Sequence, residues 1–182
     1  RSTVSGNLAS GVDGHGGGIA IGDGAVSLVN STVSGNTAGG DGGGIFVSGA
    51  TTAQHAIVSS TVASNTSGGV GGGVNVGSDL LGSLTIENSI VATNADSGST
   101  PDLSLDRVAG DLLIESTLIG DNTGTPLAEA QVPDARGNLV GAPSPGGGVI
   151  DPLLGPLMLR GGLTATHPLR AGSRAMNAGN SL

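Results

Sequence analysis

The sequence predicts an all-β protein built as a parallel β-helix, a solenoid in which short strands stack from one turn of the chain to the next. Three observations lead to this prediction: a segment repeats about every 29 residues, glycine supplies 36 of the 182 residues, and aliphatic and polar residues alternate in short runs. Glycine at this frequency disfavours helices, because each interior glycine costs a helix roughly 1 kcal/mol. Alternation of aliphatic and polar residues is typical of half-buried strands.

The repeat is clearest in a segment that ends in asparagine. Copies of this segment begin at Ser2, Ser31, Ser60, Ser89 and Thr117, so the period is 29 residues three times and then 28. Asparagine tolerates the left-handed conformation at a tight turn, and identical residues in rungs about 4.8 Å apart can hydrogen-bond to one another. We therefore expect two stacked columns in this segment. The expected asparagine ladder comprises Asn7, Asn36, Asn65, Asn94 and Asn122. The expected core ladder comprises Val4, Val33, Val62, Val91 and Ile119.

Two further short strands are expected in each repeat. One precedes the asparagine segment and places Leu28, Ile57, Ile86 and Ile114 in one column. The other follows a cluster of glycines, as in residues 42–47. A rung of three such strands buries too few side chains to be stable alone, so neighbouring rungs must cover it. These rungs are expected to span residues 1–123.

Residues 124–182 differ in composition, since they hold seven of the eight prolines. Proline has no backbone N–H and ends regular strand stacking. We predict a loop followed by a Pro/Gly-rich C-terminal cap, with short strands or capping segments at 149–150 and 157–159 over the last rung. Such a cap would cover an otherwise open sheet edge.

The repeated Ser-Thr-Val-Ser-Gly-Asn-Thr-Ala, followed by Gly-Gly-Gly-Ile, resembles the right-handed β-helix repeats of polymorphic outer-membrane proteins and related bacterial surface proteins. The motifs at 137–141, 151–157, 161–169 and 171–179 are similar to the ending of choice-of-anchor Q domains, although Arg174 stands where that family usually has proline. The resemblance implies a right-handed parallel β-helix, here of about five rungs, and a secreted or cell-surface location in bacteria. It supplies no catalytic residues.

Charge and composition exclude several classes of function. The net charge is −8, from 14 acidic residues against 6 basic ones, and no basic cluster marks a nucleic-acid interface. No apolar run approaches the 18 or so residues of a membrane span. The absence of cysteine excludes disulfides, thiolate zinc sites and cysteine nucleophiles.

Carbohydrate chemistry is the main catalytic alternative. Gly14-His15-Gly16 resembles a motif of polygalacturonases, which are also β-helical. Those enzymes need clustered aspartates to protonate the leaving group and activate water, whereas this chain has neither an Asp-Asp pair nor a lysine. Phe46 is the single aromatic residue on which a sugar could stack. We therefore predict no enzymatic activity, with a carbohydrate-binding or carbohydrate-cleaving, pectinase-like β-helix as the alternative.

Metal binding has three candidate residues. Asp13, Asp23 and Asp41 lie in glycine-rich loops of the first two rungs, where carboxylates and backbone carbonyls could bind Ca²⁺. Their spacing does not match the Gly-Gly-x-Gly-x-Asp repeat that binds Ca²⁺ in other β-helices. We expect no cofactor, interpret these aspartates as solvated turn residues, and keep Ca²⁺ as the alternative. His55 replaces an aliphatic residue in an inward column and is expected to be a satisfied buried histidine or a local bulge.

The expected function is a non-catalytic structural role outside a bacterial cell, as a stalk, an adhesin segment or a self-assembling filament subunit. The chain begins at Arg1 within a repeat unit, so an open edge is expected on which another copy stacks end to end. Surface glycans and other cell-surface proteins are the further partners considered.

Overall fold

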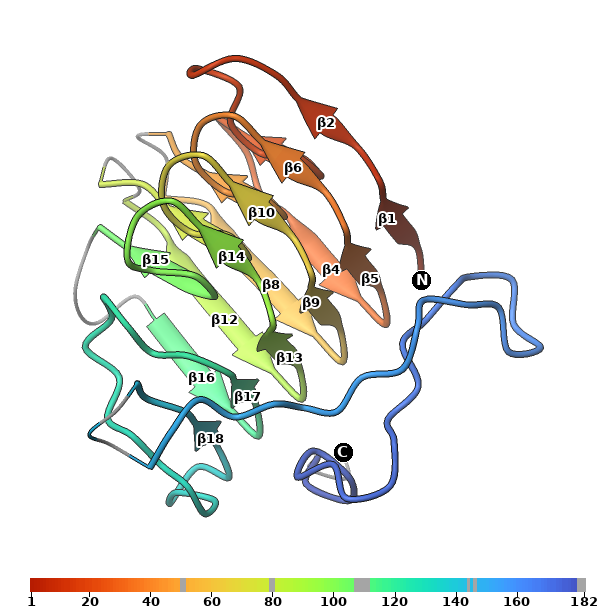
Figure 1. The fold of residues 1–182 in the computed structure, drawn as a ribbon. Helices are drawn as coiled ribbons and strands as arrows, with labels where there is room; N and C mark the ends of the chain where they lie inside the picture. Colours follow the sequence, from red (N-terminus) through yellow and green to blue (C-terminus); the bar gives the residue numbers. More distant parts are fainter. Residues whose placement is uncertain (50–51, 79–80, 107–111, 144, 146, 180–182) are drawn as a thin grey trace.

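The computed structural model of the chain describes residues 1–49, 52–78, 81–106, 112–143, 145 and 147–179. They form a parallel β-solenoid, in which the paired strands of each sheet all run in the same direction (Figure 1). All named elements are strands, and the described ranges contain no helix that is long and apolar enough to cross a membrane. The prediction of an all-β solenoid is confirmed.

Each complete rung contains four strands, one more than the sequence predicts. The first rung comprises β1 (Thr3–Ser5), β2 (Leu8–Ala9), β3 (Ile19–Ile21) and β4 (Ser27–Val29). The additional strand arises within the asparagine segment. Gly6 adopts the left-handed conformation (φ 66°) and turns the chain between β1 and β2.

Later rungs repeat this order. The second rung comprises β5 (Thr32–Ser34), β6 (Thr37–Ala38), β7 (Ile45–Val47) and β8 (Gln54–Val58). The third comprises β9 (Thr61–Ala63), β10 (Thr66–Ser67), β11 (Val74–Val76) and β12 (Ser83–Glu87). The fourth comprises β13 (Ile90–Ala92), β14 (Ala95–Asp96), β15 (Leu103–Leu105) and β16 (Leu112–Glu115).

The described chain therefore has four complete rungs, not about five. The fifth repeat contributes only β17 (Leu118–Ile119), and β18 (Leu139–Val140) then pairs with β17. Regular stacking ends there because the chain enters the proline-rich segment predicted from residue 124 onwards.

Equivalent strands of successive rungs form four sheets. Sheet A has the order β1-β5-β9-β13-β17-β18, and the other three contain one strand from each rung: sheet B (β2, β6, β10, β14), sheet C (β3, β7, β11, β15) and sheet D (β4, β8, β12, β16). In sheet A, Val33, Val62, Val91 and Ile119 point into the core and are at most 1% exposed. Val4 of the same column is only partly buried. The aliphatic column predicted from the sequence therefore forms the core of the solenoid.

Residues 123–143 and 147–150 cover the last rung. Leu127 and Ala130 pack against the core, and Ala130 forms an antiparallel bridge with Val140. Ile150 is buried, and its N–H donates to the carbonyl of Gly120 at 2.8 Å. This end of the solenoid is therefore closed by the chain itself.

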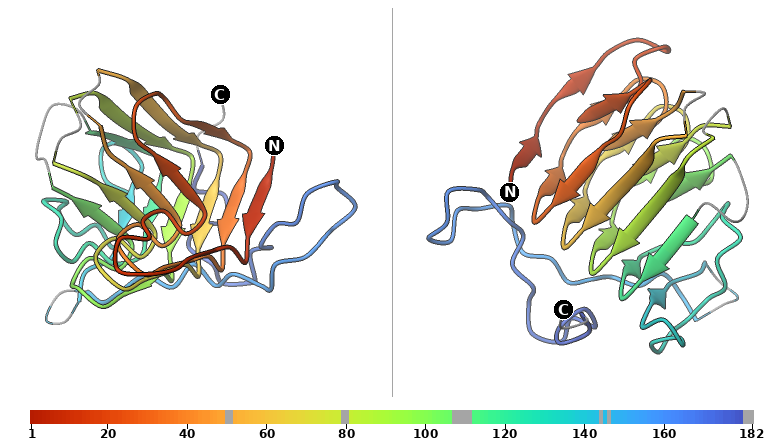
Figure 2. Two further views of the ribbon diagram at one scale, coloured as in Figure 1. Left: turned by 90° about the horizontal axis from the view of Figure 1, so that it is seen from above. Right: turned by 180° about the vertical axis from the view of Figure 1, so that it is seen from behind.

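Residues 153–170, which we call the strap, form a hairpin that runs back along the solenoid towards the first rung (Figures 1 and 2). Antiparallel bridges join Leu154 to Leu169 and Met158 to Thr166. Residues 157–159, expected to cap the last rung, lie in this hairpin. Further along it, the Thr3 hydroxyl donates to the carbonyl of Ala165 at 2.8 Å.

The outer face of sheet A explains the position of the strap. Small side chains that point outwards from this sheet, such as Ala63 and Ala92, are fully buried. Thr32 and Ser34 point the same way and are 4% exposed each. An apolar or small-residue surface of this kind is stabilised when another segment removes it from water, and residues 150–178 supply that cover.

Candidate functional site

The asparagine ladder is the most regular polar feature of the molecule. The backbone N–H and the side-chain amide of each asparagine both donate to the side-chain oxygen of the asparagine in the next rung. These distances are 3.0 and 2.8 Å from Asn7 to Asn36, 3.0 and 2.9 Å from Asn36 to Asn65, and 3.0 and 3.0 Å from Asn65 to Asn94. Asn36 and Asn65 are at most 1% exposed. The ladder therefore supplies partners for polar groups that would be costly to bury alone.

Asp102, and not Asn122, ends this ladder. The backbone and side-chain N–H groups of Asn94 donate to Asp102 Oδ1 at 3.0 and 2.9 Å, and the N–H of Asp121 donates to Oδ2 at 2.8 Å. The side chain of Asn122 instead donates to the carbonyl of Leu127 at 2.7 Å. Asn122 leaves the column because the chain turns into the cap after β17. A carboxylate suits the last position, since it accepts hydrogen bonds and has no donor left without a partner.

The sequence carried a signal for Asp102 that was missed. A glycine stands immediately before a strand of sheet C in each of the first three rungs: Gly18, Gly44 and Gly73. A Cβ at these positions would lie only 2.9, 2.9 and 2.7 Å, respectively, from the side-chain nitrogen of the asparagine in the next rung. Glycine is needed there because no side chain fits. Asp102 is the next residue of this column, since Leu103 pairs with Val74. The column therefore changes from glycine to aspartate in the fourth rung, which is the rung whose asparagine has no further asparagine stacked on it.

Burial dominates the electrostatics of Asp102. The side chain is 1% exposed. Burial raises its pKa from 3.8 to about 6, the hydrogen bonds from Asn94 and Asp121 oppose that shift, and the nearby charge of Asp121 adds to it.

A second ladder runs through the residues that open each repeat. The N–H of each donates to the side-chain oxygen of the equivalent residue one rung further on, at 3.1 Å from Ser2 to Ser31, from Ser31 to Ser60 and from Ser60 to Ser89, and at 3.3 Å from Ser89 to Thr117. Asn138 ends the series, because its side-chain oxygen accepts from the N–H of Thr117 at 3.2 Å. The aligned serines were visible in the sequence, but their bonding was not foreseen.

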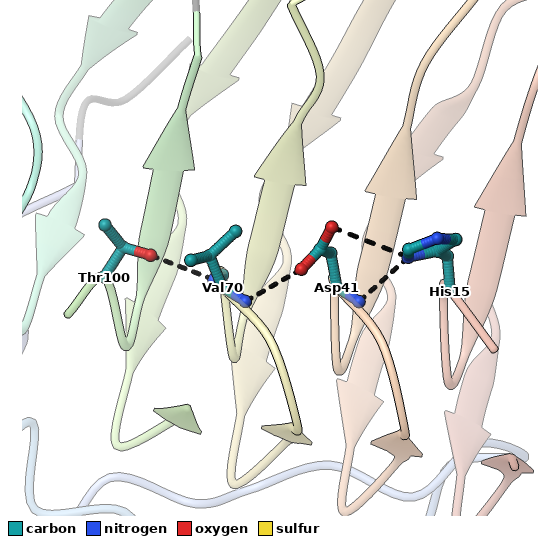
Figure 3. A network of polar contacts seen from close by, with 5 residues as sticks. His15, Asp41, Val70 and Thr100 are labelled. Atoms are coloured by element: carbon teal, nitrogen blue, oxygen red, sulfur yellow. Dashed lines mark hydrogen bonds and ion pairs between the residues drawn. The ribbon is translucent and has the colours of Figure 1, made fainter. Parts of the chain in front are cut away.

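A third, less regular series joins the loops between sheets B and C (Figure 3). The N–H of Asp41 donates to His15 Nδ1 at 2.9 Å, and the N–H of Val70 donates to Asp41 Oδ1 at 2.9 Å. In the next rung, Thr100 Oγ1 accepts from the N–H of Gly71 at 3.0 Å. The ring of His15 also stacks on Phe46, with centroids 4.6 Å apart. The histidine of the pectinase-like motif is thus held by a backbone donor and an aromatic ring.

The three candidate Ca²⁺ ligands are not brought together. Asp41 Oδ2 lies 3.6 Å from His15 Nδ1, and Asp41 Oδ1 accepts from the N–H of Val70. Asp13 lies in the loop between β2 and β3 of the preceding rung, and Asp23 lies in the turn between β3 and β4. Among the residues that the structure describes, no three histidine or acidic side chains form a group that could hold a metal ion.

His55 is buried in sheet D and is 1% exposed. Its Nδ1 accepts from the N–H of Val26 at 3.3 Å, while its Nε2 has no hydrogen-bond partner among the residues that the structure describes. The expectation of a satisfied histidine therefore holds for one ring nitrogen only. Burial lowers the pKa of this imidazole below its usual 6.5, so the ring is neutral at pH 7.

Ser34 and His167 form a pair that sequence patterns did not reveal. Ser34 Oγ lies 2.8 Å from His167 Nε2, and His167 Nδ1 lies 2.7 Å from the carbonyl of Gly155. A carbonyl only accepts, so we assign the proton to Nδ1, and Nε2 then accepts from the serine hydroxyl. Serine–histidine pairs of this geometry activate nucleophiles in enzymes. Here Ser34 is 4% exposed beneath the strap, so the pair attaches the strap to sheet A.

The residue before each ladder asparagine adopts the left-handed conformation. Gly6 and Gly35 have φ 66°, whereas Ser64 and Thr93 have φ 58° and 60°. This conformation costs an L-residue about 1–2 kcal/mol, and β-branched threonine adopts it rarely. The bend between sheets A and B thus stores strain in the third and fourth rungs.

Replacing Thr93 by glycine is expected to raise the free energy of unfolding by about 1 kcal/mol, because relief of the left-handed strain exceeds the added entropy of the unfolded chain. Equilibrium urea unfolding measures the change. Thr66→Gly is the matched control, since Thr66 is an exposed residue of β10 without positive φ. The control should destabilise the protein; equal losses in both variants would contradict the assignment of strain to Thr93.

Comparison with known proteins adds no family to this description. No family model, no curated protein and no solved structure matches the chain. The fold and its ladders define a parallel β-solenoid, and the function has to be argued from them.

Proposed function

We propose that the chain is a non-catalytic structural module, a rigid solenoid segment that acts as a stalk or spacer outside a bacterial cell. The observation that carries the proposal is the use made of its buried polar side chains. Asn36, Asn65, Asp102 and Asn138 all bond to the neighbouring rung or end a ladder. Their chemistry stabilises the stack.

The residues suited to catalysis are also held in structural contacts. His15 accepts from the backbone of Asp41, and Asp41 accepts from the backbone of Val70. His167 bonds to Ser34 beneath the strap. None of these contacts places two carboxylates across a site, as glycoside hydrolysis requires.

The location outside a bacterial cell is supported by one observation only, the resemblance of the repeat and of residues 137–179 to surface proteins. An adhesin role would need a binding face in addition. The outer face of sheet A, where Thr3, Thr32 and Thr61 align, is crossed by the strap and by residues 171–178. A stalk needs only stiffness along the solenoid, which three series of inter-rung bonds provide.

The proposal predicts that the ladder amides are the last to exchange with solvent. Amide hydrogen exchange should show that the N–H groups of Asn36, Asn65 and Asn94 exchange only through global unfolding, since each bonds to a buried acceptor. The N–H of Arg160, an exposed residue outside the strands, serves as the fast reference. Early exchange at the ladder would contradict a rigid solenoid.

The pectinase-like alternative is tested separately. Incubation of the purified chain with uronate and neutral polysaccharides, followed by a reducing-end assay, is expected to give no release above that of a His15→Ala variant. Release that the His15→Ala substitution abolishes would overturn the non-catalytic proposal.

A further inference from the structure

We propose that a groove beside the strap binds a hexuronate unit of an acidic polysaccharide. The groove has a volume of about 350 Å³, within the range of about 300–1,000 Å³ that is usual for ligand sites. Ser64 and Thr93 line it from the bend between sheets A and B, and Asp151, His167 and Arg170 line it from the C-terminal segment. Ligand binding there goes beyond the proposed structural role, because a spacer needs no ligand.

Ser64 and Thr93 supply two hydroxyls to the groove. Neither hydroxyl has a hydrogen-bond partner among the residues that the structure describes. Both residues occupy the left-handed position that is glycine in the first two rungs, at Gly6 and Gly35. Glycine suits this conformation best, so the backbone itself gives no reason for a hydroxyl there. Strained non-glycine residues cluster at ligand sites, and the two strained residues of this bend are the two that line the groove.

Arg170 supplies the positive charge. Its guanidinium forms no hydrogen bond or ion pair with any described residue, whereas its backbone N–H is held by the carbonyl of Leu153 at 2.9 Å. The surrounding segment is basic in an otherwise acidic chain, since residues 152–182 contain three arginines and no acidic residue. A planar guanidinium without a protein partner is suited to bidentate pairing with a carboxylate.

The groove also has an acceptor and an apolar wall. Asp151 Oδ1 accepts from the N–H of Leu153 at 2.7 Å, and Oδ2 has no partner in the described part of the chain. Leu154 and Pro156 add apolar surface. Apolar walls with a few polar groups that fix orientation are typical of small-molecule sites. A sugar ring, with C–H groups on its faces and hydroxyls at its edge, matches this arrangement.

The combination of groups favours a carboxylated sugar over other ligands. A neutral sugar would leave the charge of Arg170 without a partner. Phosphate would bring its charge close to the carboxylate of Asp151 and would make no use of the apolar wall. A hexuronate carries one carboxylate for Arg170 on the same ring as hydroxyls that donate to Asp151 and bond to Ser64 and Thr93.

Contacts within the protein already hold the wall of the groove in place. His167 Nε2 lies 2.8 Å from Ser34 Oγ, and His167 Nδ1 lies 2.7 Å from the carbonyl of Gly155. The N–H of Gly155 in turn donates to the carbonyl of Pro168 at 2.7 Å. Both ring nitrogens of His167 are therefore occupied, and this histidine is a positioning residue. A preformed site loses less conformational entropy when a ligand binds.

Titration calorimetry of the intact chain with a galacturonate trimer tests the ligand class. The trimer is expected to bind with a Kd of about 1 mM or tighter. Maltotriose, which lacks the carboxylate, and acetate, which lacks the hydroxyls, should each bind at least about tenfold more weakly. No binding of the trimer would overturn the proposal, and so would equal binding of either comparison ligand.

Two groove variants test the location of the site. The double variant Ser64→Gly and Thr93→Gly removes both hydroxyls and is expected to stay folded, since glycine has the same conformation at Gly6 and Gly35. This double variant and Arg170→Gln should each raise the Kd of the trimer at least about tenfold.

Arg160→Gln is the matched control, because Arg160 is an exposed arginine of the strap that does not line the groove. This control should leave the Kd of the trimer unchanged. Unchanged affinity in the double variant and in Arg170→Gln would overturn the proposed site. An equal loss in Arg160→Gln and Arg170→Gln would overturn it as well, because binding would then depend on charge alone. Exchange of the ladder amides does not depend on the trimer, so failure of this proposal is distinguishable from failure of the structural one.

Discussion

Replacing Asn65 by alanine is expected to lower the free energy of unfolding by about 4 kcal/mol, the largest effect of a single ladder substitution. Asn65 is 0% exposed and lies at the centre of the ladder. Its side-chain oxygen accepts two bonds from Asn36, and its amide donates to Asn94 and to the carbonyl of Val33 at 3.1 Å. Alanine would leave two donors of Asn36 buried without partners, and an orphaned buried donor costs about 1–3 kcal/mol.

Equilibrium urea unfolding of the Asn65→Ala variant measures this loss. Asn7→Ala is the matched control, because Asn7 is exposed and no described residue donates to its side-chain oxygen. The control should cost about 1 kcal/mol or less. Similar losses in the two variants would show that the ladder does not stabilise the core of the solenoid.

The second large effect is a dependence of stability on pH that comes from Asp102. Burial raises the pKa of Asp102 to about 6 from a reference of 3.8. Between these values the folded chain binds more protons than the unfolded chain, so its stability falls as the pH rises. The stabilising contribution of protonation is complete below pH 3.8 and is lost as the pH passes through about 6. Its size is on the order of 3 kcal/mol.

His55 changes stability in the opposite direction. Burial lowers its pKa below 6.5, so the unfolded chain takes up a proton first and stability falls as the pH drops below 6.5. The two residues partly offset one another in the wild-type chain. A comparison with the Asp102→Asn variant removes this difficulty, because His55 is present in both proteins.

Urea unfolding of wild type and Asp102→Asn at intervals from pH 4 to pH 7 isolates the contribution of Asp102. The difference in unfolding free energy, wild type minus variant, should decrease by roughly 2 kcal/mol between pH 4 and pH 7, since part of the total contribution is already lost at pH 4. Parallel pH profiles would mean that Asp102 does not titrate in this range in the folded protein.

The repeat predicted most of the fold and part of the polar site. Equal spacing set the register of sheets A and D, since stacked rungs of constant length must place identical residues opposite one another. It therefore placed Val33 on Val62 and Asn36 on Asn65. The same spacing wrongly placed Asn122 in the asparagine ladder, because an alignment of repeats does not show whether the chain still follows the solenoid at that point.

Contacts across long separations could not be read from periodicity. The strap forms single, unrepeated contacts, such as that of His167 with Ser34, so no column of the alignment marks them. The additional strand of each rung was missed for a different reason. The bend at Gly6 or Ser64 depends on a positive φ, and serine gives no sign of it in the sequence.

The strap also affects how the molecule folds. In a repeat stack each unit contacts only its neighbours, so end units can fray alone and folding can start in any unit. Thr3 bonds to Ala165 across 162 residues, and Ser34 bonds to His167 across 133. These bonds can form only after the intervening rungs have stacked, because closing so long a loop in an unfolded chain costs entropy. We therefore expect the strap to dock last and, once docked, to couple the unfolding of the first rung to that of the C-terminal segment.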